Sequence, residues 1–84
     1  MNKVEELINK LGYQVVNQWY VGYSEYAIFK DKETTVCISY NEKAPVKFVA
    51  SYIENTGYHD HRFITSGNDE NKFMEEVNRW LSIE

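Results

Sequence analysis

The sequence predicts an α+β fold in which an antiparallel sheet of about five strands, arranged as a meander, is flanked by an N-terminal and a C-terminal helix. Three observations lead to this prediction. Apolar residues recur at helical spacing near both ends of the chain, they alternate with a period of two in between, and short turn sequences separate the alternating runs. Because strands joined by short turns pair antiparallel, and two amphipathic helices can cover one sheet face, we expect the order α-β-β-β-β-β-α in two layers.

Both terminal helices are predicted from a single apolar stripe. The stripes are Val4, Leu7, Ile8 and Leu11 near the N-terminus, and Phe73, Met74, Val77, Trp80 and Leu81 near the C-terminus. Gly12 follows the first stripe, where a helix commonly ends in a left-handed residue. The second helix is expected over residues 69–81, directly after the capping residues of the segment 66–69 (Ser-Gly-Asn-Asp).

Five segments between the helices are predicted to be strands, at 13–21, 24–30, 35–40, 46–54 and 58–65. In the first segment, alternation places four apolar residues on one face: Tyr13, Val15, Trp19 and Val21. Gly22 opens a turn, residues 31–34 and 41–45 are polar loops, and 55–57 (Asn-Thr-Gly) is a short hairpin turn. The short connections predict a single domain spanning residues 1–84.

These strands carry more apolar side chains than one buried sheet face needs. Within 46–54, the neighbours Phe48 and Val49 must point to opposite faces. A strongly curled sheet, or helices on opposite sides, would bury both faces. Otherwise a contiguous aromatic patch remains to bind another protein or a second copy of the chain. The residues expected at this partner-binding surface are Tyr20, Phe29, Tyr52 and Tyr58.

The two histidines of the chain, His59 and His61, lie one residue apart on the last predicted strand. On a strand their side chains share a face, with Cα atoms about 6–7 Å apart, so both could bind one metal ion. A zinc site needs at least a third ligand. The nearest candidate is Glu54, which a two-residue turn places opposite His59 and a three-residue turn places opposite Tyr58. Because no further ligand motif is present, the sequence favours two half-exposed strand histidines, and no metal or other cofactor is expected.

Other features of the sequence argue against several classes of function. Cys37 lies in the middle of a predicted strand, where cysteine is usually a small buried apolar residue rather than a nucleophile. The net charge is −4, and the second half of the chain is acidic, which argues against binding to the phosphates of nucleic acids. A single cysteine excludes an intramolecular disulfide and fits a reducing compartment. Neither a signal peptide nor an apolar run of about 18 residues is present, so no membrane association is expected.

These features predict a small acidic cytoplasmic protein that is not an enzyme. We expect a protein-binding, regulatory or accessory module that uses an aromatic sheet surface. Richness in Asn, Lys, Ile and Tyr is typical of an AT-rich bacterial or phage genome, and the size and charge are those of accessory proteins of phages and mobile elements. The alternative is a metal-binding protein or metallohydrolase centred on His59 and His61.

Overall fold

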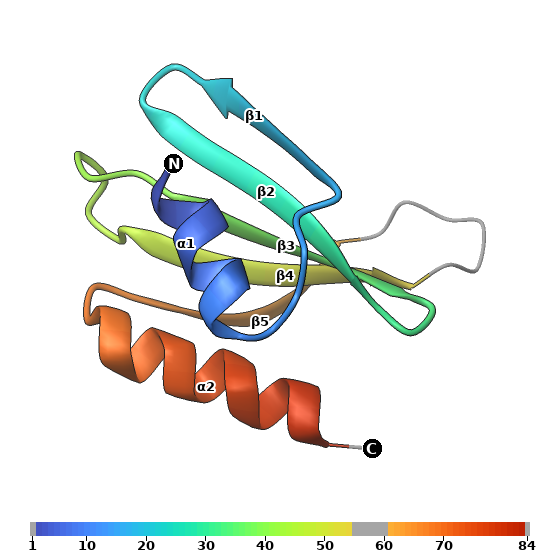
Figure 1. The fold of residues 1–84 in the computed structure, drawn as a ribbon. Helices are drawn as coiled ribbons and strands as arrows, with labels where there is room; N and C mark the ends of the chain where they lie inside the picture. Colours follow the sequence, from blue (N-terminus) through green and yellow to red (C-terminus); the bar gives the residue numbers. More distant parts are fainter. Residues whose placement is uncertain (1, 55–60, 84) are drawn as a thin grey trace.

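The elements of the fold follow one another in the predicted order. The computed structural model describes residues 2–54 and 61–83 (Figure 1). Its elements are α1 (Lys3–Lys10), β1 (Asn17–Val21), β2 (Ser24–Asp31), β3 (Thr34–Tyr40), β4 (Phe48–Glu54), β5 (His61–Gly67) and α2 (Glu70–Ser82). Each strand pairs antiparallel with the next one along the chain, so the sheet order is β1-β2-β3-β4-β5. The predicted α+β meander is therefore confirmed.

Both helices pack on the same face of the sheet. Helix α1 contacts β2 and β3, and α2 contacts β4 and β5 (Figure 1). The core between the layers consists of Val4, Leu7, Ile8, Ala27, Phe29, Val36, Ile38, Phe48, Ala50, Phe73 and Val77. Ala27 pairs with Ile38, and Ile38 with Ala50, so the strand members of this core point to one side. The alternative in which the helices cover opposite sides of the sheet is wrong.

Side-chain caps and a glycine set the helix ends. The Asn2 side chain accepts a hydrogen bond from the backbone N–H of Glu5 at 2.9 Å and begins α1. Gly12 has a φ of 89°, the left-handed conformation expected just beyond the helix. Asp69 caps α2 by accepting from the backbone N–H of Lys72 at 3.2 Å. The structure thus confirms the expected caps at Gly12 and Asp69 and adds Asn2 as the residue that begins α1.

The first strand is shorter than predicted and its apolar residues do not share one face. Strand β1 begins only at Asn17, because the chain must first cross from α1 down to the edge of the sheet. Tyr13 lies in this crossing and packs on the core, with its ring centroid 4.6 Å from that of Phe29. Trp19 instead pairs with Tyr26, which points away from the helices. The predicted alternation runs through residues 13–16, which are not part of a strand, so the predicted common face is wrong.

The pairing of the last two strands differs from both registers considered in the sequence. If Glu54 paired with His59, residue 60 would lie opposite Ile53. If Glu54 paired with Tyr58, residue 59 would lie there instead. The pairing partner of Ile53 is instead His61, and a bulge follows further along β5, where the register shifts between Ala50 and Ser51. Residues 55–60, with the predicted turn, Tyr58 and His59, lie outside the described residues.

Candidate functional site

The face of the sheet that points away from the helices is covered by no element of the described ranges 2–54 and 61–83. We call this surface the open face. Strand pairing and alternation place on it Asn17, Trp19, Val21, Ser24, Tyr26, Ile28, Lys30, Thr35, Cys37, Ser39, Val49, Ser51, Ile53, His61, Phe63 and Ser66. Phe63 is 68% exposed and Trp19 is 38% exposed. Large apolar side chains of a folded sheet are therefore left in solvent.

Residues that pair across the strands form rows on the open face, and the size of the side chains along these rows determines the relief of the surface. One row contains Trp19, Tyr26, Ser39, Val49 and Ser66, and the next contains Asn17, Ile28, Cys37, Ser51 and Phe63. The rings of Trp19 and Tyr26 are stacked, with centroids 5.5 Å apart and planes inclined by 5°. Within these two rows, large side chains thus stand on β1, on β2 and, with Phe63, on β5, whereas β3 contributes only Ser39 and Cys37. We call the positions of Ser39, Cys37 and Ser51 between the large side chains the trough.

The open face is nearly free of charge. None of its described positions is Asp or Glu, although the chain contains 13 acidic residues and has a net charge of −4. Lys30 lies at its margin, and its ammonium group donates a hydrogen bond to the Thr35 hydroxyl. Depletion of charged residues is the compositional signature of the centre of a protein interface. The open face therefore combines exposed apolar side chains with very few charges.

Cys37 lies at the centre of the open face but is shielded by its neighbours. It is 8% exposed, and burial raises the pKa of its thiol. A reactive cysteine needs the opposite, an accessible thiol whose pKa is lowered by positive charge. The side chain therefore serves as a small apolar filler of the trough.

The raised pKa of Cys37 predicts a loss of stability in mildly alkaline solution. The unfolded chain ionises its thiol first as the pH rises, so the free energy of unfolding should fall as the pH passes the ordinary thiol pKa and approaches the raised one. Urea unfolding at about pH 7.5 and about pH 9.5, on either side of the ordinary value, measures this change. The Cys37→Ala variant should lose less stability between the two conditions. Equal losses in both proteins would contradict the prediction.

The residues predicted for partner binding do not gather on one surface. Phe29 is fully buried in the core, and Tyr52 is half-buried with its ring 4.8 Å from that of Trp80 in α2. Tyr20 is 63% exposed, but it lies on the helix side of β1, where its hydroxyl accepts a hydrogen bond from Asn2. Tyr58 lies outside the described residues. None of the three described residues belongs to the open face.

The predicted partner-binding residues do not include the large apolar residues of the open face, among them Trp19, Tyr26, Ile28 and Phe63. The signal was present in the β2–β3 hairpin. The centre of one of its faces pairs Ala27 with Ile38 and Phe29 with Val36 and is apolar, whereas the other face pairs Tyr26 with Ser39 and Lys30 with Thr35 and is mixed. In an antiparallel sheet with one solvated side, the more uniformly apolar face packs on the core. The mixed face could therefore have been predicted to face solvent.

The predicted metal site is described only in part. His61 is exposed on the open face, beside Ile53. His59 and the side chain of Glu54 lie outside the described residues. Within residues 2–54 and 61–83, no group of three or more His, Cys, Asp and Glu side chains is close enough together to hold a metal ion. His61 therefore has no assembled ligand set around it in that part of the chain.

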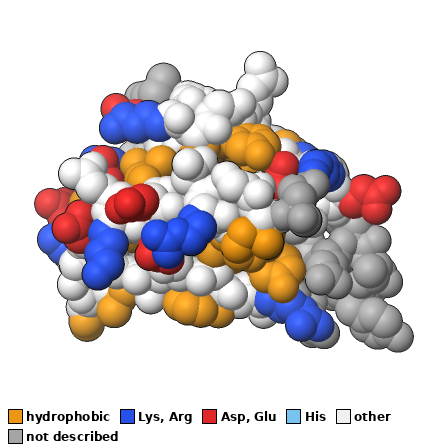
Figure 2. Space-filling view, turned by 90° about the horizontal axis from the view of Figure 1, so that it is seen from below, with side chains coloured by type: hydrophobic (Ala, Val, Ile, Leu, Met, Phe, Trp, Pro, Cys, Tyr) orange, Lys and Arg blue, Asp and Glu red, His pale blue; other side chains and the backbone are white. Residues whose placement is uncertain are grey.

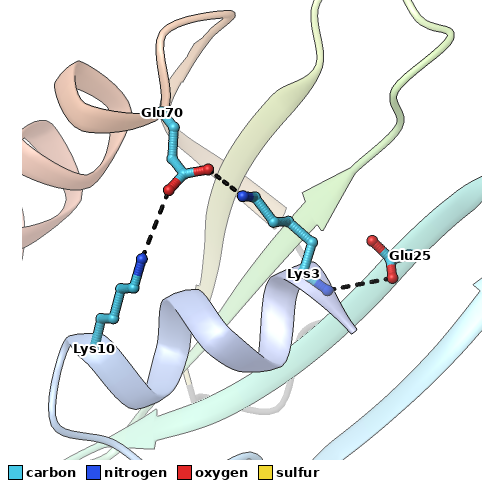
Figure 3. A network of polar contacts seen from close by, with 4 residues as sticks. All are labelled: Lys3, Lys10, Glu25 and Glu70. Carbon is cyan, nitrogen blue, oxygen red and sulfur yellow. Dashed lines mark hydrogen bonds and ion pairs between the residues drawn. The ribbon is translucent and has the colours of Figure 1, made fainter. Parts of the chain in front are cut away.

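The opposite side of the molecule is polar and held by ion pairs. The Glu70 carboxylate of α2 contacts the ammonium groups of Lys3 and Lys10 in α1, the second at 3.8 Å (Figure 3). The hydrogen bond to Glu70 raises the pKa of Lys3, whose backbone N–H lies 3.4 Å from the Glu25 carboxylate. Beside this network, a groove of about 430 Å³ lies between the helices. These contacts join the two helices and suit a structural role.

The side of the molecule seen in Figure 2 carries Lys, Arg, Asp and Glu side chains next to one another, with small hydrophobic patches between them. Within α2, Arg79 pairs with Glu76 at 3.4 Å. Charges of both signs are thus interspersed, as on an ordinary solvated helix surface.

Comparison with protein-family models, with curated proteins and with solved structures finds no match for this chain. In the described residues, neither α1 nor α2 has the length and apolar character that a membrane-crossing helix requires.

Proposed function

We propose that this chain is a small cytoplasmic binding module without enzymatic activity, and that it docks another protein chain on the open face. The observation that carries the proposal is the combination of exposed apolar side chains with the lack of acidic residues on that face. In a chain of net charge −4, sixteen positions without a carboxylate stand out from the rest of the surface. A partner would gain free energy chiefly by covering these side chains.

Chemistry supports a binding role over a catalytic one. The one thiol of the chain is shielded and its pKa is raised, so it is a poor nucleophile. Nucleotide-binding surfaces also stack bases on exposed rings, but they surround these rings with Lys and Arg. Here the margin offers Lys30, which is already bound to Thr35. An apolar protein surface is therefore the occupant that this face suits best.

The proposal is tested by replacing one exposed ring with a carboxylate. Tagged wild type, Phe63→Glu and Ile83→Glu are used to capture proteins from a host lysate, and the captured proteins are identified by mass spectrometry. Ile83 is a matched control, because it is 71% exposed and caps α2 away from the open face. We expect a protein held by wild type and Ile83→Glu to be reduced about tenfold or more with Phe63→Glu, as for a central interface residue. Equal capture by all three would refute the use of this face.

A further inference from the structure

We infer that the open face binds the open face of a second copy of this chain, giving a symmetric dimer in which two five-stranded sheets pack face to face. This inference rests on the proposed function, because it names the occupant of the same surface. Such packing places the sheets about 10 Å apart with their strands about 30° from parallel. A two-fold axis would make each copy contribute the same residues.

The size of the open face is one reason to assign a second copy. Five strands spaced about 4.8 Å apart, with about seven residues at 3.3 Å each, span about 24 by 23 Å, or about 550 Å² in projection. Protruding side chains such as Phe63 make the accessible area larger than this projection. Stable interfaces remove about 800 Å² per partner, and transient ones remove less than about 600 Å². A second copy presents a face of the same extent, and the covered area fits a reversible dimer.

Charge is a second reason. A strongly basic partner would be drawn to the acidic groups of this chain, yet the described positions of the open face contain none of them. Two identical charged faces would repel one another. Two identical faces that are almost uncharged do not, and the acidic groups elsewhere stay in solvent when the sheets meet. Charge therefore does not prevent the open faces of two copies from packing together.

The relief of the face provides the third reason. The stacked rings of Trp19 and Tyr26 stand beside a trough formed by Ser39, Cys37 and Ser51. A two-fold axis parallel to the strands and above β3 reverses the strand order, so each row of one copy lies over the same row of the other. Trp19 and Tyr26 of one copy then lie over Ser66 and Val49 of the other, and Ile28 lies over Ser51. Two packed sheet faces interdigitate when large residues of one face lie opposite small residues of the other.

The test measures the oligomeric state of the full chain by sedimentation equilibrium over a wide concentration range. Wild type should change from monomer to dimer mass with a dissociation constant on the order of micromolar, as for a small transient interface. Phe63→Glu and the central variant Ser51→Glu should each raise this constant about tenfold or more, because they place carboxylates in the contact. Ile83→Glu should leave it unchanged. Circular dichroism checks that each variant is folded.

The outcomes separate this inference from the proposed function. Wild type that remains monomeric up to about millimolar concentration would overturn the dimer, because that affinity is too weak to matter. A dimer that neither Phe63→Glu nor Ser51→Glu weakens would also overturn it, since another surface would then be responsible. If a monomeric wild type still captures a lysate protein that Phe63→Glu does not, the second copy is refuted while the proposed binding function stands.

Discussion

Replacing Phe29 by alanine is expected to lower the free energy of unfolding by about 3–5 kcal/mol, the range observed when a buried phenylalanine is removed from a core. Phe29 is fully buried and contacts the Tyr13 ring, so the truncation leaves a cavity between the helices and the sheet. Domains of this size are stabilised by only about 5–15 kcal/mol. The loss is measured by urea unfolding of wild type and variant.

Phe63→Ala is the matched control for this prediction. It removes the same atoms, but from a side chain that is 68% exposed on the open face. The expected loss is below about 0.5 kcal/mol when unfolding is measured at a concentration where the chain is monomeric. Similar losses for the two variants would contradict the assignment of one buried and one open sheet face.

The second large effect is expected for Val77→Asp. Val77 is fully buried where α2 packs on the sheet, and an aspartate there would place a carboxylate among apolar side chains. We expect a loss of about 4 kcal/mol or more, since the core residues among the described ranges include no cation to compensate the buried charge. Loss of the near-ultraviolet circular dichroism of the aromatic residues would report it.

Asn78→Asp provides the comparison for Val77→Asp. It adds the same carboxylate one position later, where the side chain is exposed to solvent. We expect its stability to stay within about 0.5 kcal/mol of wild type. A stable Val77→Asp protein would show that α2 does not pack on the sheet through this residue.

Local sequence patterns determine most of this fold. Apolar spacing predicted both helices, and the capping residues Asn2 and Asp69 and the left-handed Gly12 mark where the chain changes direction. Short turns predicted the meander, because strands that follow one another closely can hardly pair otherwise. These signals lie within a few residues of the feature they specify.

The composition of the candidate site depended on information that is not local. Phe29 and Trp19 are both aromatic strand residues, and only the position of the helices decides which one is buried. The crossing segment before β1 also reversed the face expected for Trp19 relative to Tyr13. The sequence predicts that the strands carry more apolar residues than the core needs. Predicting where the surplus lies would have required knowing the strand pairing and that both helices pack on one side of the sheet.

The meander and the ion pairs between the helices have a consequence for the order of folding. Each strand meets its neighbour across a short connection, such as the turns before β2 and before β3, so hairpins can close early at a small entropic cost. Lys3 and Glu70 can meet only after the whole sheet has brought both helices to the same side. We therefore expect the link between the first and last helices to form late in folding. A contact that forms late contributes little to the folding rate and mainly slows unfolding.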